Sequence, residues 1–231
     1  MKNHLQISIF CFLLLTSTSF LTAQQHRFYP EHGDLLFQDL DCGPLCDAIE
    51  SVTEGYHGAN FSHMGLVVLH SDSSYWVLEA TGAGVIETAF QQFIQRSTDS
   101  AGNPKVMVAR VKDAYLPLIP KVMLLKEKYL GLPYNTSYIW NDSSYYCSQL
   151  IYTLFEQANN GATFFELQPM TFKVPGGFEM NAAWKAYYQE LGIEIPEGMP
   201  GCNPGGLSRS EKIEVVYFYG TPKGYLESHS K

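Results

Sequence analysis

A cysteine stands at the head of an apolar-periodic segment in the second half of the chain. Four apolar side chains follow Cys147 at the spacing of a helix that buries one face: Leu150, Ile151, Leu154 and Phe155. Turn and cap formers at residues 141–144 place the start of this helix near Cys147. The free N–H groups and the positive dipole end of a first helical turn favour a thiolate, which is the nucleophilic form of cysteine. The pattern therefore suits a catalytic cysteine, and it equally suits a buried cysteine that only packs.

A thiol nucleophile requires a base within hydrogen-bond reach. His63 fits this role best, because it begins an apolar, strand-like run over residues 62–69. The other histidines beyond residue 23 lie near a terminus, in glycine-rich turns or at a strand end: His26, His32, His57, His70 and His229. A buried histidine has to satisfy both ring nitrogens inside the fold. A purely structural His63, bonded to a backbone carbonyl, would meet the same demand.

Glu79 is a carboxylate in an otherwise apolar run over residues 75–80. Glutamate is rarely buried without a partner. If the runs that contain His63 and Glu79 pair as neighbouring antiparallel strands, Glu79 can hold the imidazole and fix its tautomer. Together with Cys147 they would form a cysteine–histidine–acid triad. The alternative interpretation places Glu79 on the exposed face of an edge strand.

Two further kinds of site are possible. Cys42 and Cys46 flank a tight loop and could close a small disulfide in an oxidising compartment. A metal site built from His63, Glu79 and His57 fits no standard ligand spacing. We therefore predict neither a metal nor an organic cofactor.

Composition and the N-terminal residues narrow the class of protein. The chain of 231 residues is 45% hydrophobic and has a formal net charge of −8 with no basic block, so nucleic acid is not an expected partner. Lys2, the apolar run over residues 5–15 and the small polar residues that follow are typical of a signal peptide, cleaved after about Ala23. A retained N-terminal anchor is the lesser alternative. We expect a signal peptide over residues 1–23 and one domain over residues 24–231, secreted or periplasmic, without a membrane span.

Periodicity and turn signals predict an α+β fold. Strands are expected within residues 32–38, 62–69, 75–80, 85–88, 105–111 and 212–218, and helices over residues 47–53, 90–94, 119–130, 147–156 and 180–191. Loops are expected over residues 159–177, as a covering segment, and 194–206. This order lacks the alternation of a doubly wound parallel sheet, so we expect an antiparallel sheet with helices packed beside it.

Five segments resemble, in chain order, the permuted papain-like amidases of the YiiX/YaeF type. They are GDLLF (33–37), FSHMGLV (61–67), VLEA (77–80), GLPY (131–134) and YCSQL (146–150). This family is a circularly permuted relative of the NlpC cell-wall peptidases, in which the cysteine helix comes first and the histidine strand later. The order His63, Glu79, Cys147 is the permuted one. The resemblance implies a circularly permuted papain-like fold, an antiparallel sheet or partial barrel packed against helices.

The resemblance also implies roles for individual residues. Cys147 is the expected nucleophile, His63 the general base and then acid, and Glu79 the residue that orients His63. Tyr134 is expected to point its hydroxyl at the site and to help hold the oxyanion, or else to pack as a turn aromatic. Tyr146, next to the nucleophile, is a second tyrosine candidate for this role.

The predicted function is that of a secreted or periplasmic cysteine hydrolase that cleaves amide bonds through an acyl-enzyme. Relatives suggest a cell-wall peptide as the substrate, and the lipid-facing branch of the superfamily suggests an N-acyl amino acid or an acyl lipid. Two alternatives use the same fold, namely an acyltransferase with the same triad and a noncatalytic lipid- or peptide-binding protein. Fast alkylation of Cys147 by iodoacetamide, slowed in Glu79→Gln, would separate catalysis from binding alone.

Overall fold

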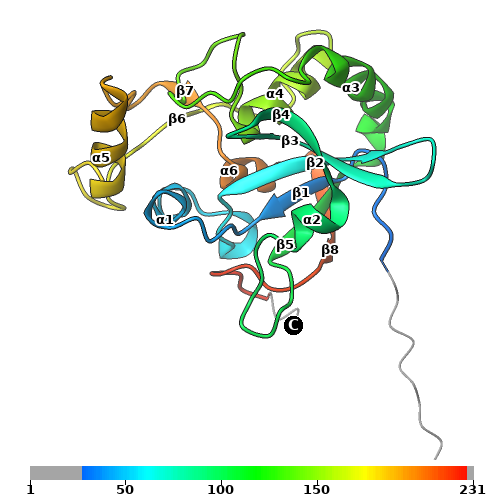
Figure 1. Ribbon diagram of the computed structural model, residues 1–231, viewed down its shortest axis with the longest axis horizontal. Coiled ribbons are helices and arrows are strands. Elements are labelled where there is room, and N and C mark those ends of the chain that lie inside the picture. Colours follow the sequence, from blue (N-terminus) through cyan, green and yellow to red (C-terminus); the bar gives the residue numbers. More distant parts are fainter. Residues whose placement is uncertain (1–27, 228–231) are drawn as a thin grey trace, which may run out of the picture.

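Six strands form one open antiparallel sheet in the computed structural model, which describes residues 28–227 (Figure 1). The order across the sheet is β4-β3-β2-β1-β5-β8, so β4 and β8 are its edges. The strands are β1 (Leu35–Gln38), β2 (His63–Leu69), β3 (Tyr75–Thr81), β4 (Gly84–Ala89), β5 (Val106–Val111) and β8 (Ile213–Phe218). The predicted α+β class with an antiparallel sheet is confirmed, as an open sheet and not a closed barrel. The expected signal peptide lies outside the described residues.

The helices, apart from the last one along the chain, follow the predicted apolar-periodic segments closely. They are α1 (Pro44–Ser51), α2 (Phe90–Ile94), α3 (Ile119–Leu125), α4 (Cys147–Ala158), α5 (Ala182–Leu191) and α6 (Pro204–Ser208). Three short 3₁₀ helices join them: η1 (Tyr56–Gly58), η2 (Asp113–Leu118) and η3 (Lys126–Lys128). The longest helix is α4, and the buried positions predicted from its spacing are all buried. None of the helices between residues 28 and 227 has both the length and the apolar character needed to cross a bilayer.

Both faces of the sheet are covered, which explains why β2 is apolar along most of its length. On one face, Met64 and Leu66 pack against Leu150 and Ile151 of α4. On the other face, Val67 packs in a second cluster formed largely with α2. Successive side chains of a strand point to opposite faces, so an apolar residue is needed at nearly every position.

The strands β2 and β3 form the predicted hairpin and set the register of the site. Leu66 pairs with Leu78 and Val67 pairs with Val77, antiparallel. His63 lies at the first position of β2, and Glu79 follows Leu78 in β3. The hairpin therefore brings His63 and Glu79 to the same end of the sheet.

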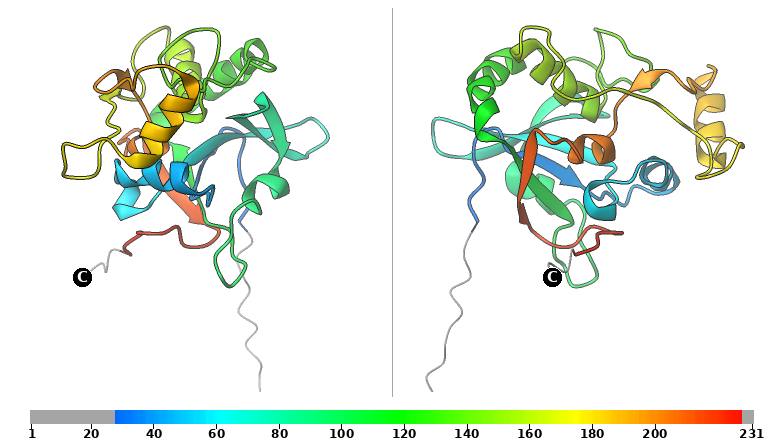
Figure 2. Two further views of the ribbon diagram at one scale, coloured as in Figure 1. Left: turned by 60° about the vertical axis from the view of Figure 1, so that its left-hand side comes forward. Right: turned by 180° about the vertical axis from the view of Figure 1, so that it is seen from behind.

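A long excursion, residues 159–203, leaves the sheet after α4 and carries α5. In Figures 1 and 2, α5 lies beside α1 and apart from the sheet. Trp184, Tyr188 and Phe172 form a separate hydrophobic cluster there with Ala48 of α1. The covering segment predicted from the sequence is therefore anchored by its own small core.

The excursion also holds short elements that the sequence did not predict. The strands β6 (Gln168–Pro169) and β7 (Pro200–Gly201) pair with each other across it, and α6 follows at its end. These elements have two to five residues. Periodicity cannot reveal elements this short, and a pair of strands that meet from distant parts of the chain has no local signal.

Gly65 is a position in β2 at which a side chain does not fit. A Cβ there would lie 2.4 Å from Cγ1 of Val77 and 3.0 Å from the carbonyl oxygen of Leu78. We expect Gly65→Ala to lower the free energy of unfolding by about 1–3 kcal/mol, because overpacking displaces neighbouring atoms. Urea denaturation measures this change. Gly82→Ala is the matched control, since a Cβ at Gly82 meets nothing within 4 Å; equal losses in both variants would contradict the prediction.

Candidate active site

Cys147 is the first residue of α4, as predicted, and its side chain is 6% exposed. Tyr146 precedes the helix, and its backbone N–H donates to Oε1 of Gln149 at 3.4 Å. Upstream, the side chain of Asn141 accepts from the backbone N–H of Ser143 and Ser144 and closes the expected turn. The sulfur therefore lies where the first N–H groups of a long helix have no partner within the helix.

His63 connects the other two members of the predicted triad. Its Nε2 lies 2.5 Å from Oε2 of Glu79, and Cys147 on its other side contributes to the raised pKa of its ring. Because Nε2 faces the carboxylate, Nδ1 is left for the sulfur. The structure thus brings together all three predicted residues, from β2, β3 and α4.

The three residues meet at the end of the sheet. The ring of His63 packs near Phe93 on the α2 face, with 5.8 Å between ring centroids. Cys147 belongs to the cluster on the opposite face. Because His63 is the first residue of β2, its ring can contact α4 beyond the end of the strand. Glu79 lies farther into the sheet and has no exposed surface.

Arg96 and Thr88 hold Glu79 from the side away from Cys147. The guanidinium of Arg96 donates to both carboxylate oxygens, at 2.9 and 2.6 Å, and Oγ1 of Thr88 donates to Oε1 at 2.5 Å. Thr88 lies in β4 opposite Val77, and Arg96 follows α2 and stacks on Phe93 at 5.2 Å. The sequence analysis missed Arg96. The signal was weak, since a single arginine after a short amphipathic segment is ordinarily a solvated residue.

These contacts set the charges of the triad. Burial disfavours the ionised form of Glu79, but hydrogen bonds from Arg96 and His63 outweigh burial and lower the pKa of Glu79 to about 2. Burial also opposes protonation of His63, but hydrogen bonds with Cys147 and Glu79 raise the pKa of His63 to about 9. At neutral pH the site holds an anionic carboxylate and a cationic imidazolium. An imidazolium beside sulfur is the charge that supports a thiolate.

The two tyrosine candidates differ in where their hydroxyls point. The hydroxyl of Tyr134 lies 3.5 Å from that of Tyr138. Burial, followed by the charges of Tyr138 and Cys147, raises the pKa of Tyr134. The hydroxyl of Tyr146 instead accepts from the backbone N–H of Cys202 at 3.3 Å. The hydroxyl of Tyr146 is therefore engaged by the backbone of Cys202, whereas that of Tyr134 faces another tyrosine of the cavity.

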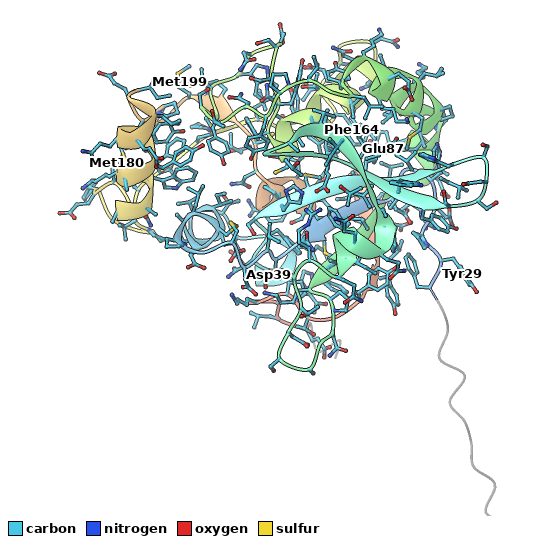
Figure 3. All side chains as sticks on the ribbon, viewed as in Figure 1. Tyr29, Asp39, Glu87, Phe164, Met180 and Met199 are labelled. Carbon is cyan, nitrogen blue, oxygen red and sulfur yellow. A yellow bond between two sulfur atoms is a disulfide. The ribbon has the colours of Figure 1, made fainter. Side chains whose placement is uncertain are left out.

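Cys147 opens onto a cavity of about 920 Å³. One wall includes Phe164, which Figure 3 labels close to α4, and the other belongs to the excursion that carries α5, where Met180 and Met199 are labelled. The aromatic lining residues are Tyr115, Tyr134, Tyr138, Tyr146, Phe164, Phe165, Phe172 and Trp184. The charged ones are Glu54, Glu166, Arg209, Glu211 and Lys212. A cavity of this size accommodates a ligand as large as a short peptide or an acyl chain.

The remaining cysteines do not share the environment of Cys147. Cys42 and Cys46 are joined in a disulfide at the start of α1, as the sequence suggested. Cys202 is a free, buried thiol that also lines the cavity. Burial raises the pKa of Cys202 to about 12, so it remains protonated at neutral pH.

An antiparallel sheet that carries a histidine and an acid, followed along the chain by a core helix that begins with a cysteine, defines a papain-like arrangement in permuted order. A family model described as permuted papain-like amidase enzymes, YaeF/YiiX, C92 family, matches residues 29–217. The chain therefore belongs to the permuted papain-like amidase family. The resemblance inferred from the sequence is confirmed.

Two relatives come from Escherichia coli. The uncharacterized protein YiiX of strain K12 is 27% identical over 146 residues, which are 63% of this chain and 67% of YiiX. The crystal structure of metalloprotein YiiX from E. coli O157:H7 superposes with a TM-score of 0.66 at 25% sequence identity. The superposition covers 84% of this chain and all of that one.

That relative is called a metalloprotein, but the residues of the present site do not fit a metal ion. Both carboxylate oxygens of Glu79 already accept hydrogen bonds, and the guanidinium of Arg96 beside them repels a cation. Between residues 28 and 227, no three His, Cys, Asp or Glu side chains are grouped so that they could hold a metal ion. His57, the third member of the metal alternative, stacks on Tyr56 instead.

The charge of Glu79 should be measurable in the titration of His63. We expect the imidazole of His63 to titrate near pH 9 in the wild type, and about one pH unit lower or more in Glu79→Gln, because a neighbouring carboxylate favours the imidazolium. NMR of the ring carbon-bound protons measures both values. Glu87→Gln is the matched control, since Glu87 is hydrogen-bonded at 2.8 Å to another histidine, His70. A His63 titration that moves in Glu87→Gln, or stays fixed in Glu79→Gln, would contradict the assignment.

Proposed function

We propose that this protein is a cysteine hydrolase that cleaves amide bonds through an acyl-enzyme. The observation that carries the proposal is the position of His63, hydrogen-bonded to Glu79 and in electrostatic contact with Cys147, which lines a large cavity. Membership in a family of amidases supports it. The substrate is an amide of either a peptide or an N-acyl compound.

The chemistry follows from the charges of the site. The thiolate of Cys147 attacks the carbonyl carbon, and the oxyanion that forms is stabilised by N–H groups at the start of α4 and by the hydroxyl of Tyr134. As the C–N bond breaks, the imidazolium of His63 donates its proton to the leaving nitrogen, and a thioester remains on Cys147. Neutral His63 then takes a proton from water, which attacks the thioester. The products are a carboxylic acid and the regenerated thiol.

Hydrolysis of a chromogenic amide tests the proposal. We expect the purified protein to release p-nitroaniline from acyl p-nitroanilides, and to lose this activity in Cys147→Ala. In His63→Gln the rate should fall by about 10²-fold or more, because a positioned acid–base contributes that much. Release that persists in Cys147→Ala would rule out the thiol mechanism.

The second free thiol provides an internal control. Iodoacetamide at neutral pH should alkylate Cys147 and leave Cys202 unmodified, because the pKa of Cys202 is raised to about 12. Cys202→Ala should still be alkylated at Cys147, as intact-mass and peptide-mass measurements would show. An unreactive Cys147 would instead favour a noncatalytic binding protein.

We also propose that the protein acts outside the cytoplasm. The signal-like residues 1–23 and the Cys42–Cys46 disulfide support this location, since disulfides persist in oxidising compartments. We expect a fusion of the full chain to alkaline phosphatase, which is active only after export, to show activity in a bacterial host. The same fusion without residues 2–23 should be inactive, and equal activity of the two would contradict the proposed location.

A further inference from the structure

The indole N–H of Trp184 is a buried hydrogen-bond donor with no partner. Trp184 is 3% exposed, lies in the first turn of α5 and lines the large cavity. Of the buried, unpaired side-chain polar atoms between residues 28 and 227, it is the one that belongs to a residue of this cavity. A buried donor without a hydrogen bond lowers the stability of the folded protein. An unpaired donor in a cavity wall therefore indicates that the cavity binds a ligand with a hydrogen-bond acceptor.

Tyr138 packs against Trp184 and lines the same cavity as the proposed nucleophile. Its ring is perpendicular to that of Trp184, with 5.5 Å between the ring centroids. Its hydroxyl lies 3.5 Å from that of Tyr134, and the charge of Cys147 influences the pKa of both hydroxyls. A substrate held at Cys147 would therefore have these rings within its reach.

The backbone of Tyr138 is held in a strained conformation. Its φ is +56°, in the left-handed region that bulky side chains rarely adopt. Two hydroxyls of α5 fix the preceding backbone, because Tyr187 donates to the carbonyl of Thr136 at 2.6 Å and Tyr188 to that of Ser137 at 2.9 Å. Strain maintained by surrounding contacts is typical of ligand-binding walls. An acceptor bound to the N–H of Trp184 would therefore lie beside the half-buried ring of Tyr138.

We propose that Trp184 and Tyr138 form a substrate subsite for an apolar group that carries a carbonyl oxygen. This inference rests on the proposed amide hydrolysis at Cys147 and selects between its two substrate classes. A peptide places an apolar side chain and a further carbonyl next to the scissile amide. The side chain can pack on the two rings, and the carbonyl can accept from the N–H of Trp184. A plain alkyl chain would fill the same space and leave the donor unpaired, which is unfavourable. The subsite therefore favours a peptide over an N-acyl lipid.

Two matched electrophiles test the subsite. Acetyl-phenylalanyl chloromethyl ketone and its analogue without the acetamido group differ in one carbonyl-bearing group, and with both the sulfur of Cys147 displaces chloride to form a thioether. For each variant, the rate at which each chloromethyl ketone alkylates Cys147 is divided by the rate for iodoacetamide. This ratio corrects for differences in the reactivity of the thiol. We expect the wild type to prefer the acetamido probe. Trp184→Phe should reduce this preference by about tenfold, the worth of one buried hydrogen bond.

A matched control separates loss of the donor from loss of a tryptophan. Trp76→Phe removes an indole N–H that is paired with Oγ of Ser74 at 2.9 Å and lies outside the cavity, so it should keep the wild-type preference. An unchanged preference in Trp184→Phe, or an equal loss in Trp76→Phe, would overturn the subsite. A wild-type Cys147 that iodoacetamide does not alkylate would instead overturn the hydrolase proposal itself.

A second measurement needs no change at Trp184. The chain has 3 tryptophans, so the indole N–H signals in an NMR spectrum can be assigned with Trp76→Phe and Trp140→Phe. In the protein that retains Trp184, we expect the indole N–H signal of Trp184 to move downfield when Cys147 carries the acetamido probe. The signal should move less when Cys147 carries the analogue. A Trp184 signal that responds equally to both adducts would show that this N–H does not recognise the carbonyl, and would favour an alkyl substrate.

Discussion

The negative charge of Glu79 is the constraint on which the site depends. A carboxylate with no exposed surface is stable only when its oxygens are fully hydrogen-bonded and a positive charge lies beside it. Arg96 supplies the charge and two hydrogen bonds, and Thr88 and His63 supply the others. Because Glu79 is thereby kept ionised and fixed in place, it fixes the ring of His63 as well. The cation beside Cys147 thus depends on contacts made on the far side of the sheet.

The permuted order of the elements along the chain does not change the geometry of the site. A triad requires only that its three side chains lie next to one another. Here they do so because α4 packs on one face of the sheet while His63 occupies the end of β2. Glu79 is one strand away on the neighbouring β3. The sheet holds the base and the acid, and the helix dipole lies at the sulfur. The same physical site results whether the cysteine helix precedes or follows the strands.

Much of the site could be predicted from the sequence because its members break or begin local patterns. Cys147 begins a helical period, His63 begins an apolar strand, and Glu79 is a lone carboxylate within one. Arg96 could not be predicted, because its partner comes from an earlier strand and it lies just beyond the short amphipathic segment over residues 90–94. The same holds for Tyr138, whose positive φ is imposed by contacts with α5, more than forty residues later in the chain. Long-range contacts determine these two features, and local patterns do not record them.

The Cys42–Cys46 disulfide gains a physical role once α5 is considered. It joins the residue before the N-cap of α1 to a residue within that helix. The N-cap itself, Gly43, offers no side chain to satisfy the free N–H groups. Ala48 of α1 is in turn the surface on which Trp184 and the rest of the small α5 cluster pack. A start of α1 that frayed would loosen this platform and the cavity wall with it. The disulfide therefore supports the cavity wall that carries Trp184, while the position of Cys147 depends on the packing of α4 against the sheet.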